Sequence, residues 1–143
     1  MTIFFSGIWD SSTFDKSRQA ALSAVQIAVE AQHLSPGRSL IIVDDLMYLH
    51  SMRRQIYVIG RKVGAVTVVL CVKTPLEMAI QRNILRPPSA RVDEATIRRI
   101  FEHFEYPNVK YTAERISLVV DGASAERCVI FESVDNILFA EQK

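Results

Sequence analysis

Two uninterrupted apolar runs constrain the fold of this chain most strongly. Residues 40–44 (LIIVD) and residues 66–72 (VTVVLCV) are rich in β-branched side chains and show no alternation between polar and apolar positions. Such runs are typical of strands that are buried on both faces, as in a parallel sheet covered by helices. Helix-like segments lie before, between and after them. Strands that alternate with helices predict an α/β fold, with a parallel sheet flanked by helices.

The segments around these runs have the periodicity and the end signals of helices. Apolar positions recur every three or four residues in 14–33 and again in 51–63, where Gly64 follows as a C-cap residue would. Thr74 and Pro75 resemble the N-cap and first position of the next helix. The remaining predicted elements are the rest of that helix to about residue 83, a helix over 93–104, strands over 117–121 and 128–132, and a final helix over 133–141.

The size and charge of the chain favour one domain without a strong overall field. Its 143 residues can bury one core, and its net charge of +1 gives no general attraction to nucleic acid or membrane. Cys71 and Cys128 each lie in an apolar run, which predicts buried thiols rather than a disulfide or a zinc site. No window approaches the ~18 apolar residues of a membrane span, and the N-terminus has no basic signal region. We therefore expect a soluble, cytoplasmic protein.

Asp44 and Asp45 are the first candidates for chemistry, because they end a predicted buried strand. Ligands in parallel α/β folds bind beyond the carboxyl ends of the strands. A carboxylate there can hold a Mg²⁺-bound water or orient a nucleophile in nucleotide-dependent phosphotransfer. It can equally cap the following loop or lie in solvent, and the pattern alone leaves both interpretations open.

Arg82 and Arg86 form the second candidate group. They are four residues apart, so on a helix they would share one face. Two guanidiniums can bind phosphate oxygens and neutralise the charge on a transferred phosphoryl group, although solvated surface arginines show the same spacing. The other basic residues are scattered over the predicted helices, and the histidines, His33, His50 and His103, show no metal-ligand spacing.

The motif G-x-x-x-x-G-K-[ST] does not occur in the sequence. Nucleotide kinases of this architecture cradle phosphates with that loop after their first strand. The glycines are at positions 7, 37, 60, 64 and 122, and none of them fits the spacing. The sequence therefore predicts a chain without the usual phosphate loop.

Several motifs together resemble the L-seryl-tRNA(Sec) kinase family, P-loop kinases that phosphorylate the serine carried by selenocysteine tRNA. The resemblance runs from about residue 28 to residue 120 and rests on VDDLMYLHSMR, YVIGRK, TPLEMAIQRNILRP and FEYPN. The residues that fit the family's motifs are Asp44, Asp45, Tyr48, Ser51, Met52, Arg53, Pro75, Leu76, Glu77, Gln81, Arg82, Asn83, Arg86, Glu105 and Pro107.

This resemblance implies ATP and Mg²⁺ as cofactors and Ser-tRNA(Sec) as the substrate of the complete enzyme. By the same resemblance, the catalytic residues would be Asp44, Asp45, Arg82 and Arg86. Asp44 would serve the metal, and Arg82 and Arg86 would also bind ATP. The substrate-binding residues would be Tyr48, Ser51 and Arg53. Because the phosphate loop is missing, we expect the isolated chain to have little kinase activity.

The chain also departs from this pattern. Leu49, Glu102 and Ala113 replace an aromatic residue, an arginine and a tryptophan that are usual in the family. The region that carries the first strand and phosphate loop looks absent. We therefore expect a single partial kinase-like domain over 1–143, best defined over 14–121, with a less defined end over 122–143.

Three alternatives remain at this point. The sister family of Elongator-associated P-loop ATPases has the same layout. A non-catalytic module that binds tRNA or protein would use the remaining surface, and a fragment without function is the third alternative. Loss of a strand would expose core, so a dimer or a partner protein is expected to cover the open sheet.

Overall fold

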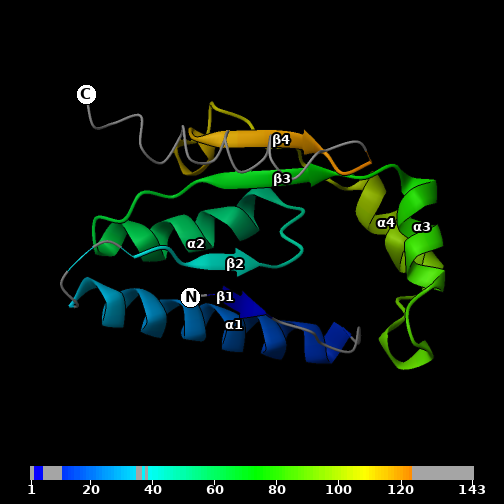
Figure 1. The fold of residues 1–143 in the computed structure, drawn as a ribbon, viewed down its shortest axis with the longest axis horizontal. Coiled ribbons are helices and arrows are strands. Elements are labelled where there is room, and N and C mark those ends of the chain that lie inside the picture. The colour runs from blue at the N-terminus through cyan, green and yellow to red at the C-terminus, as the bar shows by residue number, and fades with distance from the viewer. Residues whose placement is uncertain (1, 5–10, 35–36, 38, 124–143) are drawn as a thin grey trace.

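Helices and parallel strands alternate along the computed structural model, which describes residues 2–4, 11–34, 37 and 39–123 (Figure 1). The elements in chain order are β1 (Thr2–Phe4), α1 (Ser11–His33), β2 (Ile42–Asp44), α2 (His50–Lys62), β3 (Val69–Lys73), α3 (Leu76–Ile84), the 3₁₀ turn η1 (Pro88–Ala90), α4 (Glu94–Glu102), the 3₁₀ turn η2 (Thr112–Glu114) and β4 (Ser117–Asp121).

The strands form two parallel pairs. β1 pairs with β2, with Ile3 opposite Val43, and β3 pairs with β4, with Cys71 opposite Val119. In Figure 1 the strand arrows point the same way, and α3 and α4 lie beyond the carboxyl ends of β3 and β4. The predicted α/β fold with a parallel sheet and flanking helices is thus confirmed.

One described element differs from the predicted order. We expected the chain to start with a helix and to lack the first strand, but β1 precedes α1 and pairs with β2. A strand of three residues is too short to give a readable periodicity. The segment 5–10 that joins β1 to α1 lies outside the described residues, as do the predicted strand over 128–132 and helix over 133–141.

The core lies between α1, α2 and β2. Val25 and Ala28 of α1 are buried against Ile59 of α2, because residues three or four apart share a helix face. The half-buried apolar residues that pack on this cluster are Leu22, Val29, Ile41, Val43 and Ile56. This packing fixes β2, and hence the aspartates at its end, against two helices.

The opposite side of the strands is less covered than the sequence suggested. Ile42, Leu70 and Val72 are 48%, 42% and 54% exposed, so the prediction that both faces are buried is wrong for these residues. Successive side chains of a strand point to opposite faces, and the buried neighbour Cys71 shows which face of β3 is covered. Burial raises the pKa of the Cys71 thiol, as predicted for a structural cysteine, while Cys128 lies outside the described residues.

Among the described residues, no helix has the length and apolar character needed to cross a membrane.

Candidate functional site

The two aspartates at the end of β2 have different surroundings. Asp44 is exposed, and its carboxylate forms no hydrogen bond or ion pair with the described part of the chain. Asp45 lies 3.8 Å from Nη1 of Arg18 and accepts a hydrogen bond of 2.7 Å from the backbone N–H of Leu46. The carboxylate of Asp45 is therefore already bound by groups of the protein, whereas that of Asp44 is available to a ligand.

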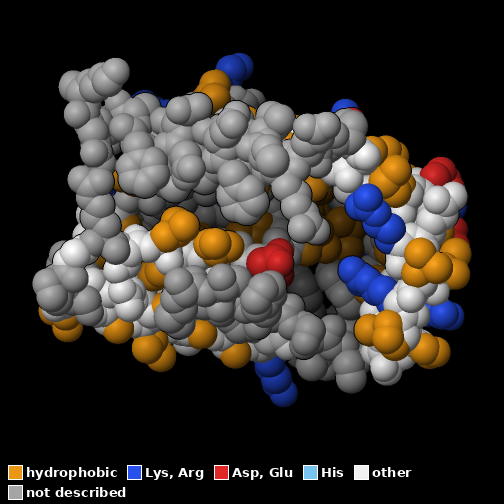
Figure 2. Space-filling view, viewed as in Figure 1, with side chains coloured by type: hydrophobic (Ala, Val, Ile, Leu, Met, Phe, Trp, Pro, Cys, Tyr) orange, Lys and Arg blue, Asp and Glu red, His pale blue; other side chains and the backbone are white. Residues whose placement is uncertain are grey.

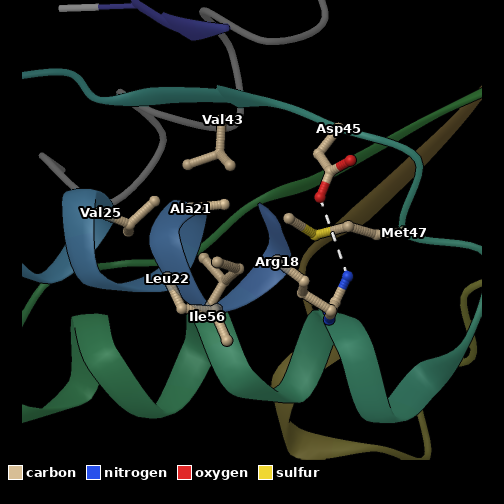
Figure 3. A pocket seen from close by; sticks show the side chains of 8 residues that line it. All are labelled: Arg18, Ala21, Leu22, Val25, Val43, Asp45, Met47 and Ile56. Atoms are coloured by element: carbon tan, nitrogen blue, oxygen red, sulfur yellow. Dashed lines mark ion pairs between the residues drawn. The ribbon is translucent and has the colours of Figure 1, made fainter. Parts of the chain in front are cut away.

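A small pocket adjoins Asp45 (Figure 3). Its polar lining consists of the Arg18–Asp45 ion pair, and the rest is apolar. The lining residues are Arg18, Ala21, Leu22, Val25, Val43, Asp45, Met47 and Ile56. Most of them also belong to the core, so we regard this pocket as a packing feature and place the candidate site at the strand ends.

Arg82 and Arg86 lie in the last turn of α3 and just after it, and α3 lies beyond the carboxyl end of β3. Arg82 is in the last turn of α3, and its Nη2 donates a hydrogen bond of 3.2 Å to the carbonyl of Gly122, just after β4. Arg86 is exposed and lies beyond the end of α3 at Ile84, so the expectation that both arginines share one helix face is wrong in that respect. The residue before Pro87 is disfavoured from helical geometry, which fits the end of α3 at Ile84, close to the predicted end at about residue 83.

The carboxyl ends of β3 and β4 approach each other closely at Gly122. Its N–H donates to the carbonyl of Lys73 at 2.7 Å, and a Cβ at this position would lie 2.8 Å from Oγ1 of Thr74 and from Cγ1 of Val72. Lys73 extends its ammonium group to 5.8 Å from the centroid of the Tyr106 ring. Glycine at position 122 thus allows β4 to end directly beside the basic residue at the end of β3.

Figure 2 shows a hollow at this end of the molecule. Acidic side chains lie on one side of it, near the carboxyl end of β2, and Lys and Arg side chains lie on the other, over the α3–α4 region. Opposite charges across a hollow can hold a metal–phosphate group, with the carboxylates toward the metal and the guanidiniums toward the phosphates.

α3 and α4 are held together as a hairpin, which we define as residues 76–102. The side chain of buried Asn83 donates to the carbonyl of Val92 at 2.7 Å and accepts from the N–H of Val92 at 2.9 Å. Asp93 caps α4 by accepting a hydrogen bond from the N–H of Thr96 at 3.3 Å. Within the predicted motif QRN, the asparagine therefore shapes the hairpin that carries Arg82.

The predicted substrate-binding residues do not form one exposed group. Ser51 is exposed and Tyr48 is half-buried, but Arg53 is 5% exposed and points inward. Its Nε donates to Glu114, and its Nη1 and Nη2 donate to the carbonyls of Met47 and Glu105, each at 2.6 Å. This burial favours a role for Arg53 in holding the structure over the predicted contact with substrate.

Glu114, the partner of Arg53, was not among the residues predicted from the sequence. The residue is 1% exposed and also accepts from the N–H of Asn108, with Nδ1 of His50 at 2.8 Å from both carboxylate oxygens. Burial opposes its ionisation, but the hydrogen bonds from His50, Asn108 and Arg53 hold the pKa of Glu114 below its ordinary value. No local signal marks this glutamate, because Arg53 lies 61 positions earlier in the chain.

A family model described as "Chromatin associated protein KTI12" matches residues 5–143. The chain belongs to the KTI12 family. This family fits the alternative of an Elongator-associated P-loop relative, which sequence analysis kept beside the seryl-tRNA(Sec) kinase resemblance.

This KTI12-family chain is similar to a tRNA kinase in sequence and to a solved Kti12 structure in fold. L-seryl-tRNA(Sec) kinase of Methanococcus maripaludis is 31% identical over 81 residues, which are 57% of this chain and 31% of that protein. The crystal structure of Chaetomium thermophilum Kti12 in complex with ADP-AlF3 matches with a TM-score of 0.67 at 21% identity, covering 92% of this chain and 70% of that one. The structural likeness establishes the fold alone, an α/β fold with parallel strands flanked by helices.

Proposed function

We propose that this KTI12-family chain binds ATP through its phosphates at the carboxyl edge of its strands, as part of a tRNA-linked P-loop enzyme. The observation that carries this proposal is the open carboxylate of Asp44 at the end of β2, with Arg82 and Arg86 on the hairpin beyond the ends of β3 and β4. Ligands of parallel α/β folds bind at this edge. The Kti12 of Chaetomium thermophilum, which shares the fold, was solved with ADP-AlF3.

Mg²⁺ fits the oxygen donors at this edge. The described residues contain no group of three or more His, Cys, Asp or Glu side chains that could enclose a metal. Mg²⁺ does not need such a group, because it commonly binds one or two carboxylates together with the phosphates of its nucleotide. Asp44 would hold the ion, which neutralises phosphate charge when bound, and Asp45 would support it while paired with Arg18.

Arg82 and Arg86 would contact the phosphates. Both are exposed, and Arg82 is bound only to a backbone carbonyl among the described groups, which a charged phosphate can displace. Two guanidiniums placed in this way would stabilise the negative charge that spreads over a transferred phosphoryl group.

A titration of the full chain with ATP and Mg²⁺, followed by calorimetry, tests the proposal. Asp44→Asn and Arg82→Gln should each weaken binding by about tenfold or more, because each removes one charge-assisted contact. Arg61→Gln is the matched control: this exposed arginine is in the last turn of α2, whose first turn faces the site. Unchanged affinity in both site variants, or no binding by the unsubstituted chain, would show the proposal to be wrong.

Phosphorylation of Ser-tRNA(Sec) is the second candidate function. It is favoured by the 31% identity to L-seryl-tRNA(Sec) kinase over 81 residues. The sequence lacks G-x-x-x-x-G-K-[ST], so we expect little phosphoseryl product from this chain, below roughly 0.1 per second, whereas kinases turn over at about 1–100 per second. Measurable tRNA binding without ATP binding would instead favour a non-catalytic module.

A further inference from the structure

Glu105 joins the exit of the hairpin to the loop that follows β2. It lies three residues after the end of α4, within the motif FEYPN, and the nucleotide site proposed above gives it no role. Its N–H donates to the carbonyl of Tyr48 at 2.8 Å, and its side-chain Oε2 accepts from the N–H of His50 at 2.5 Å. Both the backbone and the side chain of Glu105 thus bind residues that lie three and five positions after Asp45.

The first turn of α2 depends on this contact. Leu49 occupies the N-cap position and forms no side-chain cap, so α2 has no N-cap hydrogen bond from its own sequence. The first N–H groups of a helix lack partners within the helix, and a carboxylate stabilises that end through both hydrogen bonding and charge. Glu105 supplies this cap from 55 positions away.

Arg53 holds the same two segments together through hydrogen bonds from its guanidinium. Its Nη1 donates to the carbonyl of Met47 and its Nη2 to the carbonyl of Glu105, both at 2.6 Å. The first carbonyl belongs to the loop after Asp45, and the second to the exit of the hairpin. One buried guanidinium therefore connects the loop that follows Asp45 to the segment that follows the hairpin.

We propose that Glu105 is a positioning residue, which sets the separation between the carboxylates of Asp44 and Asp45 and the guanidiniums of Arg82 and Arg86. The hairpin can transmit this constraint, because the paired hydrogen bonds between Asn83 and Val92 hold its two helices together. The importance of the separation for catalysis rests on the proposed function. The separation itself does not depend on the proposed function, because it can be measured without nucleotide.

Spin labels on the full chain test whether the hairpin keeps its position relative to α2, the helix that Glu105 caps. One label replaces exposed Leu85 on the hairpin and the other replaces exposed Lys62 at the end of α2, with the two native cysteines changed to alanine. We expect Glu105→Ala to broaden the label-to-label distance distribution. Glu105→Gln keeps an acceptor oxygen, so its distribution should be nearly as narrow as that of the unsubstituted chain. Glu102→Ala is the matched control, because this exposed glutamate forms no side-chain hydrogen bond with the described residues.

Hydrogen exchange gives a second readout at the contact itself. The N–H of His50 should exchange roughly fivefold faster in Glu105→Ala, the factor that corresponds to the loss of a typical helix cap. The backbone bonds of Glu105 and Arg53 remain in this variant, so we expect it to fold. An unchanged distance distribution in Glu105→Ala, or an equal broadening in Glu102→Ala, would overturn the proposal. Failure of ATP to bind would count against the proposed function alone.

Discussion

At the scale of single residues, the buried pair of Arg53 and Glu114 is the most demanding feature of the chain. Two charges removed from water cost several kcal/mol unless their hydrogen-bonding groups are satisfied. Here each nitrogen of the guanidinium has an oxygen within 2.6 Å, and both carboxylate oxygens have partners. The pair therefore specifies how α2, η2 and the segment after α4 meet.

Removal of one charge from this pair should be costly. We expect Glu114→Ala to lower the free energy of unfolding by about 3 kcal/mol or more, because Arg53 would remain buried without its counter-charge. Urea denaturation followed by circular dichroism measures this change. Glu102→Ala, at an exposed position, should stay within about 0.5 kcal/mol, and a similar loss in both variants would contradict the explanation.

The same glutamate predicts how stability depends on pH. The pKa of Glu114 is lower in the folded chain than its ordinary value of 4.5, so the folded state holds the ionised form more strongly than the unfolded state does. Its contribution is fully present well above pH 4.5 and is lost as the pH falls through the folded pKa. Denaturation midpoints between pH 7 and pH 3 should fall more steeply for the unsubstituted chain than for Glu114→Gln.

At the scale of elements, the sequence patterns predicted those helices and strands whose bounds depend on residues close together in the chain. The strand over 117–121 was predicted with its observed bounds, and α2 lies one residue from its predicted position. α3 starts one residue later than expected, with Pro75 at the N-cap and no side-chain cap. β1 was missed because it is short. The position of Asp44 at the end of a strand could be predicted, since it depends on the apolar run beside it.

Contacts between distant segments could not be predicted in this way. The burial of Arg53 depends on Glu114, and the cap of α2 depends on Glu105, and neither partner is near in sequence. An arginine in the first turns of a helix gives the same local pattern whether it faces solvent or the interior. The resemblance to kinases marked Arg53 and Glu105 but not Glu114, and the contacts of all three residues required the fold.

The hairpin offers a test at this scale. Asn83→Ala removes both hydrogen bonds to Val92 and leaves that half-buried backbone without these partners, so we expect a loss of about 1–3 kcal/mol. Hydrogen exchange should accelerate at the N–H of Val92 and change little in α1. Gln81→Ala, at an exposed position of the same helix, is the control, and an equal effect there would argue against the role of Asn83.

At the scale of the whole molecule, the exposed apolar side chains of Ile42, Leu70 and Val72 give the strands one incompletely covered side. Monomeric proteins rarely expose large contiguous apolar patches, and such patches mark association or partner binding. We therefore still predict that a partner or a second copy covers the open side of the strands. The exposure of these residues supports this prediction.

This exposure predicts association that depends on concentration. Val72→Lys places a charge on the exposed side of β3 and should shift sedimentation velocity profiles toward the monomer. Val109→Lys, at a more exposed position in a loop, adds the same charge away from the strands and should leave the profiles unchanged. If all three chains sediment alike, the uncovered side does not drive association.

The paired hydrogen bonds between Asn83 and Val92 also have an evolutionary consequence. They close the hairpin at the point where α3 ends and α4 begins, so the stretch between these two residues, which includes Arg86, is structurally separated from the helices that carry it. Insertions or deletions in this stretch would leave α3 and α4 in place. Related proteins could therefore diversify the tip of the hairpin, and with it the choice of what approaches the strand edge, without rebuilding the domain.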